Sequence, residues 1–317
     1  MQADKPTVRT GPPRILCTGI AVLDQVFRVA AFPQHDEKTR ALEFASVVGG
    51  GAANAAIAIV RLGGVACFAG PLGGGSGDDP VGDGILAGLE AAGVSCDCVR
   101  VDGKTSPVSA VLVDAKGGRT IVHHRDAALG MAQADDPERL VADVDGVLAD
   151  DHYPDFVAPI CAAARRRGVP VVLDVEKPVS AGAPLWIAAT HRIFSRSGFA
   201  ATTRPGDLAA CLARLAAGDE AFHAVTDGAR PVCWRAGKSG GEMPVFPVDA
   251  VDTLAAGDVF HGAFALALLE AGDSLRALRF AAAAAALKCR RFGGGTAAPT
   301  RAEVDRFLAG AEAIRAI

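Results

Sequence analysis

The second half of this chain alternates between short apolar runs and longer amphipathic stretches. From Val144 onward the pattern predicts strands at 144–149, 169–175, 192–195 and 222–226, with helices at about 155–167 and 207–217 between them. Alternating strands and helices are typical of a parallel sheet that carries helices on both faces. The sequence therefore predicts a doubly wound α/β fold.

Segments 25–47 and 107–124 depart from this alternation. The first mixes alternating apolar and polar residues, and the second has two strand-like runs around a Gly-Gly turn, which is a hairpin pattern. A hairpin does not belong to a βαβ unit, so we expect these segments to form a small second sheet. The main domain is then expected to comprise 14–24, 48–106 and 125–317, after a loose polar tail at 1–13.

Composition and charge exclude several classes of protein. The net charge is -4 and no basic stripe is visible, so a nucleic-acid partner is not expected. The most apolar stretch, residues 281–287, is too short to span a membrane. The eight cysteines show no C-x-x-C pair or zinc spacing. Because the polar start also lacks a targeting signal, we expect reduced thiols and a cytoplasmic location.

The stretch Asp252–Asp258 and the apolar run after it predict a helix start. Asp252 and Thr253 are candidate N-caps, and Ala255, Ala256 and Gly257 have almost no side chain. A phosphate could therefore approach their amides, where a helix has unpaired donors and a positive dipole end. Asp258 places a carboxylate beside this anion site. The combination suggests a phosphoryl-transfer centre with a proton acceptor.

A second motif lies near the start of the chain. Gly49, Gly50 and Gly51 precede a predicted helix that contains Asn54, and Asp24 follows the predicted strand 14–22. A dinucleotide fingerprint fails, because Asn54 stands where a third glycine is needed. Small residues and one amide suit a polyhydroxylated ligand. Asp24 is either a substrate ligand at the sheet edge or a turn former, and the sequence leaves both open.

A P-loop is excluded as the nucleotide site. Gly103-Lys-Thr105 and Gly237-Lys-Ser239 look like P-loop endings, but Cys98 and Val232 stand where the first glycine belongs. Any ATP must therefore be bound by another arrangement.

The two glycine-containing motifs, Gly49-Gly50…Asn54 and Asp252-Thr253…Ala256-Gly257-Asp258, together resemble the ribokinase or PfkB-type sugar kinase family over nearly the whole chain. The resemblance implies a ribokinase-like, Rossmann-type α/β sandwich with a small β-sheet lid, formed by 25–47 and 107–124. It also implies ATP and Mg²⁺ as cofactors.

The resemblance assigns roles to individual residues. Asp258 matches the family's catalytic base, and the amides of Ala255, Ala256 and Gly257 match its anion hole. The sugar-binding positions fall on Asp24, Gly50, Gly51 and Asn54, and the nucleotide-binding positions on Thr226, Gly228, Asp252 and Thr253.

Two departures affect the metal and the substrate. The family's N-x-x-E segment should fall at Ser195–Gly198, where both key residues are absent, so no metal ligands are assigned. Mg²⁺ would be held mainly by water and phosphate oxygens. The closest-looking branch is sulfofructose kinase: Lys38 matches a lid lysine, whereas His123 and His152 replace other polar residues of that branch. Together the three could gather positive charge for an anionic sugar.

The sequence thus predicts an ATP-dependent kinase that phosphorylates a primary hydroxyl of a ketose or related sugar, with an anionic sugar as a minority option. A nucleoside kinase and a catalytically silent sugar or nucleotide sensor are the alternatives. Asp258 is expected to be ionised at neutral pH, because aspartate starts near a pKa of about 4 and a helix N-terminus favours its charge. The open lid sheet predicts a homodimer joined through the lids.

Overall fold

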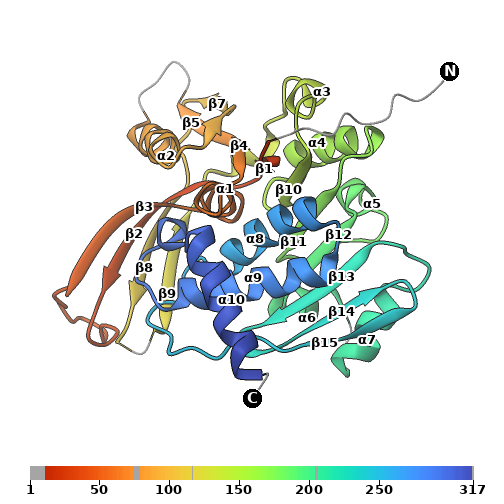
Figure 1. Cartoon of the computed structure of the whole chain (residues 1–317). Coiled ribbons are helices and arrows are strands. Elements are labelled where there is room, and N and C mark those ends of the chain that lie inside the picture. Colours follow the sequence, from red (N-terminus) through yellow and green to blue (C-terminus); the bar gives the residue numbers. More distant parts are fainter. Residues whose placement is uncertain (1–10, 75–78, 116, 204–205, 316–317) are drawn as a thin grey trace.

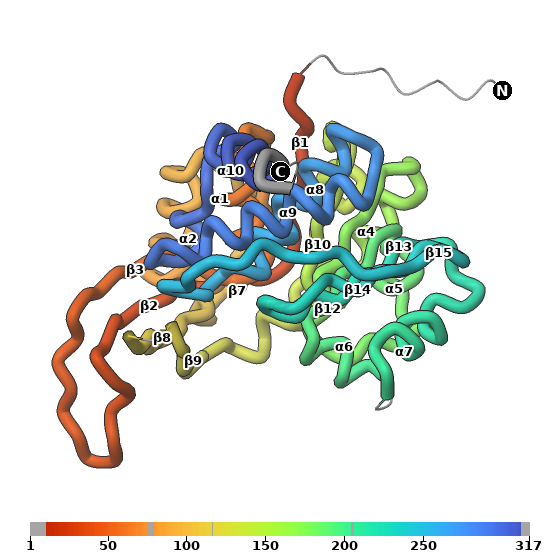
Figure 2. The backbone as a smooth tube through the Cα atoms, turned by 60° about the horizontal axis from the view of Figure 1, so that its bottom comes forward, coloured from red at the N-terminus to blue at the C-terminus, as the bar shows by residue number. Residues whose placement is uncertain are grey.

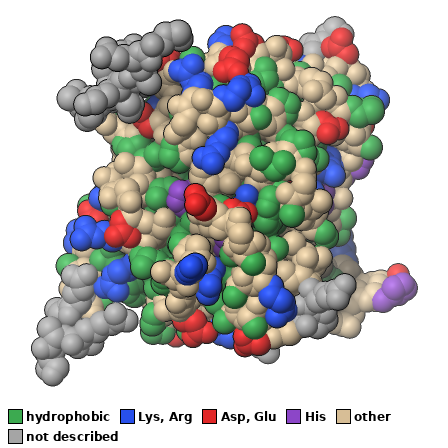
Figure 3. Space-filling model, turned by 90° about the vertical axis from the view of Figure 1, so that its right-hand side faces the viewer, with side chains coloured by type: hydrophobic (Ala, Val, Ile, Leu, Met, Phe, Trp, Pro, Cys, Tyr) green, Lys and Arg blue, Asp and Glu red, His purple; other side chains and the backbone are tan. Residues whose placement is uncertain are grey.

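The structure is a computed structural model that describes residues 11–74, 79–115, 117–203 and 206–315 (Figure 1). Most of the expected tail at 1–13 lies outside these residues. No helix within the described ranges is long and apolar enough to cross a lipid bilayer. Positive and negative side chains are interspersed on the face of the molecule shown in Figure 3.

The largest sheet has nine strands among the described residues, in the order β15-β14-β13-β12-β11-β10-β1-β4-β6. In this order, all the strands between β13 and β6, both included, run parallel to one another. β14 and β15 are added antiparallel at the edge beyond β13. The strands are β1 (Arg14–Thr18), β4 (Val65–Ala69), β6 (Ser95–Cys96), β10 (Gly146–Asp150), β11 (Val171–Val175), β12 (His191–Ser195), β13 (Phe222–Asp227), β14 (Arg230–Ala236) and β15 (Ser239–Met243).

Helices cover both faces of this sheet, so the predicted doubly wound α/β fold is confirmed. One face packs against α1 (Gly51–Arg61), α2 (Pro80–Ala91), α8 (Ala256–Ala271), α9 (Ser274–Cys289) and α10 (Arg301–Arg315). The other packs against α4 (Pro154–Arg166), α5 (Pro184–Ala188), α6 (Arg196–Thr202) and α7 (Leu208–Leu215). The shorter elements are β5 (Pro71–Gly74), β7 (Val99–Asp102), α3 (Pro137–Leu140) and the 3₁₀ turns η1 (Ala127–Met131) and η2 (Gly295–Ala297).

The two cores follow from side-chain alternation along the strands. In β1, Ile15 and Cys17 belong to the core under α1 and α8, whereas Leu16 belongs to the core under α4. Successive side chains of a strand point to opposite faces, so a strand buried on both sides must be apolar throughout. This explains the continuous apolar runs in the sequence.

A second, four-stranded sheet has the order β3-β2-β8-β9 and projects to one side of the main body (Figures 1 and 2). Its strands are β2 (Val22–Arg28), β3 (Glu43–Gly49), β8 (Val108–Val113) and β9 (Arg119–His124). They come from the two segments expected to form a small sheet, except that β2 begins at Val22 and β3 ends at Gly49. Asp24 therefore lies within this sheet and not in the main domain as expected.

The strand order of the main sheet reverses direction at β1. β1 lies between β4 and β10, so the chain leaves β1 toward one side and later returns on the other. Open α/β sheets bind ligands at the carboxyl ends of the strands where the order reverses in this way. The carboxyl ends of β1 and β10 meet here, beside the first turns of α1 and α8.

Candidate active site

Helix α8 begins with a tight backbone turn made of small residues. It starts at Ala256, and Ala255 is its N-cap in the left-handed conformation, with φ 61°. That conformation costs an L residue about 1–2 kcal/mol. The expectation that Asp252 or Thr253 caps this helix is therefore wrong. A Cβ added at Gly257 would meet no described atom within 4 Å, so there is room for an anion beside the first-turn amides.

Asp258 lies in this first turn and is held by Asn54. The Asn54 side chain donates a hydrogen bond from Nδ2 to Asp258 Oδ2 at 2.6 Å, and its Oδ1 accepts one from the Gly295 amide at 3.0 Å. Asn54 lies in α1, which packs against α8. The fold thus joins two motifs separated by 204 residues. Asn54, expected to bind sugar hydroxyls, orients the Asp258 carboxylate here.

The charge state of Asp258 differs from the expectation. Burial, together with the nearby carboxylates of Glu176, Asp150 and Asp24, raises the pKa of Asp258 to about 7, although the Asn54 hydrogen bond opposes the shift. The expectation that Asp258 is ionised at neutral pH overlooked desolvation and the neighbouring negative charges, which both favour the protonated form. A carboxyl group that titrates near 7 is well matched to proton transfer at neutral pH.

The glycines before α1 let the chain approach itself closely. A Cβ at Gly49 would lie 1.9 Å from Asp24 Oδ2, and one at Gly50 would lie 2.5 Å from the Ile20 carbonyl oxygen. Gly50 also has φ 93°, which favours glycine. Asp24 is only 7% exposed, and burial raises its pKa to about 6 against an opposing hydrogen bond from Ser109. Because Gly49 has no side chain, the Asp24 carboxylate can lie against the backbone just before α1.

Asp150, at the end of β10, was not singled out from the sequence. Its Oδ2 accepts hydrogen bonds from the amides of Ile20 at 2.8 Å and Ala52 at 3.1 Å, and its Oδ1 accepts one from the His152 amide at 3.0 Å. Burial opposes ionisation, but His152 and these amides hold the pKa of Asp150 below its usual range. A buried carboxylate thus ties β1, β10 and the start of α1 together. Gly51 lies against it, with a Cβ position 3.4 Å from Asp150 Oδ2.

Asp174, Glu176 and His261 are three further titratable residues near Asp258. Asp174 Oδ2 is 3.3 Å from His261 Nδ1, and both side chains are buried. Burial raises the pKa of Asp174 well above its usual value, helped by Glu176 and Asp258, and lowers that of His261 to about 4. Burial thus favours the uncharged form of both side chains. The sequence signal was an acidic residue at the end of a predicted strand, the rule already applied to Asp24.

The residues do not form a preassembled metal centre. No group of three or more His, Cys, Asp or Glu side chains within the described ranges could hold a metal ion. Ser195–Gly198 stands where the family's N-x-x-E segment would fall. Here Ser195 Oγ accepts a hydrogen bond from the Gly198 amide at 3.0 Å and caps α6. The protein side chains thus do not fit a dedicated Mg²⁺ site.

His123 and His152 both lie at the site, although on different elements. Asp24, Ser109 and His123 are direct neighbours across β2, β8 and β9, so their side chains share one face of the small sheet. His123 Nδ1 lies 3.1 Å from Ser109 Oγ. His152, after β10, has Nδ1 3.4 Å from Asp150 Oδ1.

Cations gather near these histidines. Burial lowers the pKa of His123, as do the positive charges of Arg125, His152, His124 and Lys177, in decreasing order. Arg125 donates a hydrogen bond to the His152 carbonyl oxygen at 3.3 Å. Burial opposes protonation of His152, but Asp150 raises its pKa above the usual value.

Lys38 lies apart from this cluster. It is an exposed residue in the connection between β2 and β3, beyond the last pair of the hairpin, Arg28 and Glu43. Asp24 pairs with Val47 near the other end of the same hairpin. Figure 2 shows this hairpin reaching away from the body of the molecule. The chain by itself thus does not bring Lys38 to the other candidate residues.

The expected nucleotide residues lie in two places. Thr226 is the second-last residue of β13, at the carboxyl edge of the sheet, and its Oγ1 donates to the Phe194 carbonyl oxygen at 3.2 Å. Gly228 follows in the turn with φ 58°. Thr253 accepts hydrogen bonds from Arg119 of β9 at its carbonyl oxygen, 3.0 Å, and at Oγ1, 2.9 Å. Asp252 is 1% exposed and bonded within the protein, so its side chain is not free to contact a nucleotide.

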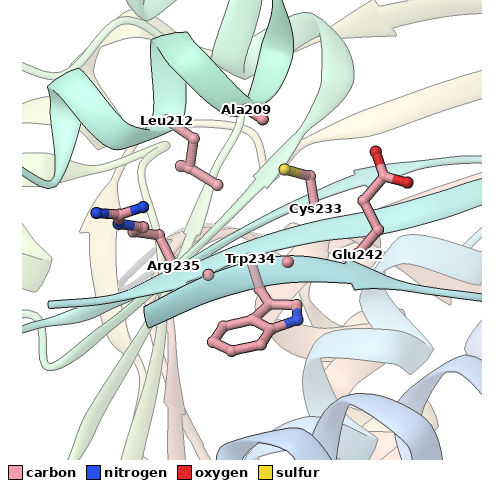
Figure 4. Close-up of a pocket in the computed structure, with 8 residues that line it drawn as sticks. Ala209, Leu212, Cys233, Trp234, Arg235 and Glu242 are labelled. Atoms are coloured by element: carbon pink, nitrogen blue, oxygen red, sulfur yellow. The ribbon is translucent and has the colours of Figure 1, made fainter. Parts of the chain in front are cut away.

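A separate pocket of about 190 Å³ lies between α7 and the β14–β15 hairpin (Figure 4). Leu212 and Cys233 face it, whereas the Trp234 side chain points to the other side of the sheet. None of the candidate site residues lines it.

A family model for the pfkB family carbohydrate kinases matches residues 12–301. The chain belongs to this family. Among curated relatives, it is 32% identical to a ribokinase of Bacillus subtilis, over 93% of this chain and 99% of that protein. It is also 32% identical to an ATP-dependent ribose-1-phosphate kinase of Halopiger xanaduensis, over 93% and 98% of the two chains.

Solved structures agree with this membership. A ribokinase candidate from Agrobacterium tumefaciens superposes with a TM-score of 0.88 at 36% identity, over 95% of this chain and 99% of that one. A fructokinase with bound ATP from Xylella fastidiosa superposes with a TM-score of 0.75 at 26% identity, over 94% and 99%. The predicted ribokinase-like fold is thus confirmed, and the chain is an ATP-dependent phosphotransferase of this family of sugar and nucleoside kinases.

Proposed function

We propose that this PfkB-family kinase transfers the γ-phosphate of ATP to a primary hydroxyl of a sugar, with Asp258 as the base. The observation that carries the proposal is the position of Asp258. It lies in the first turn of α8, beside the open space at Gly257, and Asn54 orients its carboxylate. An anion site and a proton acceptor are thereby combined in one turn of helix.

The proposed reaction is a direct displacement at the γ-phosphorus. The sugar oxygen forms a bond to phosphorus as the bond from phosphorus to the β,γ-bridging oxygen breaks, and ADP leaves. Asp258 accepts the hydroxyl proton, so it must be ionised when the sugar binds. The amides of Ala255, Ala256 and Gly257 are proposed to stabilise the negative charge on the phosphate oxygens.

The other site residues are proposed to bind the two substrates. Asp24, Asn54 and the backbone at Gly50 and Gly51 would contact the sugar; in support, Asn54 bonds Asp258, and the Asp24 carboxylate lies against Gly49. Thr226, Gly228 and Thr253 would contact the nucleotide. Mg²⁺ would arrive with ATP and be held by phosphate oxygens and water, a mode of binding that this ion tolerates.

The small sheet is proposed to act as a lid over the sugar. Its Asp24–Ser109–His123 row faces the site, and Arg119 at the start of β9 bonds the phosphate-side loop at Thr253. A lid with these contacts would exclude water, which would otherwise compete with the sugar for the γ-phosphate. The same contacts support the proposed division of the chain into a kinase body and a lid.

One observation favours a sugar that carries an anionic group. Arg125, Lys177, His123 and His152 lie near one another on the lid side of the site. The 32% identical Halopiger relative is named for a phosphorylated sugar. The carboxylates of Asp150 and Glu176 flank His152 at 3.4 and 3.8 Å, however, so they offset part of the positive charge. We therefore propose a ketose or related sugar, and among anionic sugars a sugar phosphate ahead of sulfofructose.

Measuring ADP release tests the proposal. The panel would contain ribose, fructose, ribose 1-phosphate, fructose 6-phosphate, 6-sulfofructose and three nucleosides, each with ATP and Mg²⁺. We expect turnover with at least one sugar or sugar phosphate and none with nucleosides. Turnover with nucleosides alone would show a nucleoside kinase, and no turnover with any acceptor would favour a silent sensor.

A further inference from the structure

Lys288 of α9 is a buried ammonium group that the proposed reaction has not yet used. Its side chain is fully buried, and Nζ donates hydrogen bonds to the Asp252 carbonyl oxygen at 3.1 Å and to Asp252 Oδ2 at 3.2 Å. Lysine is rarely buried to this extent without a specific partner. Both of its bonds go to the residue that opens the phosphate-side loop.

Asp252 connects the Lys288 ammonium to the backbone of the loop. Its Oδ1 accepts a hydrogen bond from the Leu254 amide at 2.8 Å, and its Oδ2 accepts one from the Gly293 amide at 3.0 Å. The Asp252 amide in turn donates to the Cys289 carbonyl oxygen at 3.1 Å. The ammonium, the carboxylate and three backbone groups therefore fix the chain just before Ala255.

The loop needs such support at this point. Ala255 holds a left-handed backbone conformation, and the helix that carries Asp258 starts at the next residue. A non-glycine residue stays in that conformation only when its surroundings impose it. The Lys288–Asp252 pair and its amide bonds supply these surroundings from behind the loop.

Packing alone does not require an ammonium at position 288. Replacing a buried ion pair by apolar side chains of similar volume is often neutral or stabilising. Lys288 also interacts electrostatically with the reaction centre: burial lowers its pKa, whereas the negative charges of Asp252, Cys289 and Asp258 oppose that shift. Its hydrogen bonds to Asp252 thus connect the ammonium to the loop that leads to Asp258.

We propose that Lys288 is a positioning residue for phosphoryl transfer, an internal cation that neutralises the buried Asp252 carboxylate and fixes the 252–257 loop behind its phosphate-binding amides. This role rests on the proposed function, since the charge is useful only where a phosphate accumulates negative charge. The ammonium would favour the γ-phosphate over a nucleotide that lacks it, and would leave sugar binding nearly unchanged.

Replacing Lys288 by methionine keeps the length of the side chain and removes the charge. We expect Lys288→Met to lower kcat by about 10- to 100-fold and to leave the KM for the sugar within about twofold. As a control, Lys104→Met removes a lysine that is 40% exposed and lies 3.9 Å from Asp126. It should leave kcat unchanged.

Chemical rescue separates a charge effect from a packing effect. Lys288→Ala leaves a cavity, so methylammonium should restore part of kcat, whereas tetramethylammonium at the same ionic strength is too large to enter. Lys288→Arg should retain more activity than Lys288→Met. Wild-type kcat in Lys288→Met, or no response of Lys288→Ala to methylammonium, would overturn the proposal.

A binding measurement keeps this test independent of the acceptor. The ratio of affinities for the non-hydrolysable ATP analogue AMP-PNP and for AMP should fall about tenfold in Lys288→Met. If the wild-type protein phosphorylates no acceptor while this ratio still falls, the proposed function fails and only the contribution of Lys288 to binding the nucleotide phosphates stands. If wild-type turnover is normal and the ratio is unchanged, the role of Lys288 fails alone.

Discussion

At the scale of single residues, Asp258 meets two opposing demands. It must be buried beside the helix amides to reach the sugar hydroxyl, but burial among Glu176, Asp150 and Asp24 raises its pKa to about 7. A stronger base is more effective once ionised, whereas a raised pKa leaves fewer molecules ionised below pH 7.

The first prediction concerns the pH dependence of activity. Because the base must be ionised, kcat/KM should rise about tenfold per pH unit below the pKa and level off above about 7. Asp258→Asn should lower kcat by roughly a thousandfold or more and leave ATP binding largely intact. Steady-state kinetics from pH 5 to 9 would check both. Near-normal turnover of the asparagine variant would contradict the role of Asp258.

The second prediction concerns stability and the same side chain. The folded-state pKa of Asp258 is raised from 3.8 to about 7, so its contribution to stability is complete below about pH 4 and is lost as the pH rises toward 7. At pH 8 the fold therefore holds a buried, unfavourable charge. Asp258→Asn removes this charge and still accepts the hydrogen bond from Asn54. Its Tm should exceed the wild-type value by about 2–5 °C at pH 8.

The difference in Tm between the two proteins should nearly vanish at pH 4. Thermal unfolding of the unliganded proteins at pH 4, 6 and 8 would measure it. A wild-type protein that is the more stable of the two at pH 8 would contradict a raised pKa.

At the scale of elements, the junction between the small sheet and α1 sets the geometry of the sugar side. β3 ends at Gly49, α1 starts at Gly51, and the Asp24 carboxylate of β2 fills the space where a Gly49 side chain would stand. Glycine at this junction is therefore required by the close approach of two elements.

The third prediction follows from this contact. In Gly49→Ala the new Cβ would lie 1.9 Å from Asp24 Oδ2, so the carboxylate must move away from its place. We expect the KM for the sugar to rise about tenfold or more, with little change in ATP affinity. Gly84→Ala in α2 is a matched control, because its Cβ would make an ordinary contact of 3.7 Å with Leu23. Equal kinetics of the two variants would contradict the proposed placement of Asp24.

At the scale of the whole molecule, the outer face of the small sheet carries an exposed apolar patch. Strand register places Phe27, Phe44 and Leu112 on the face opposite to Asp24, and Val122 joins them from β9. Phe44 is 58% and Val122 71% exposed, and the rings of Phe27 and Phe44 are 5.0 Å apart. We propose that a second copy of the chain covers this face, because an uncovered apolar sheet with open edges favours association.

The fourth prediction tests the dimer. Sedimentation velocity at about 10 µM should show a dimer for the wild-type protein and a monomer for Phe44→Asp combined with Val122→Asp, because both charges would be buried in the interface. Ile187→Asp is a suitable control, since Ile187 is 63% exposed on α5, on the main body. A wild-type monomer at this concentration would contradict the proposal.

The local pattern of the sequence was sufficient for the architecture. The alternation of apolar runs with amphipathic stretches predicted the parallel sheet and its helices, since these periods depend only on neighbouring residues. The Gly-Gly turn predicted the β8–β9 hairpin for the same reason. The boundary at Val22 was missed because β2 belongs to the small sheet only through its pairing with β3 and β8.

For the site, the sequence by itself determined the residue types: a carboxylate after small residues, and an asparagine after glycines. Only the tertiary structure decided how they act. It brought Asn54 to Asp258 across 204 residues and placed Asp252 on the Lys288 ammonium. It also raised the pKa of Asp258. A pKa depends on desolvation and on charges distant in the chain, and neither exists until the fold has formed.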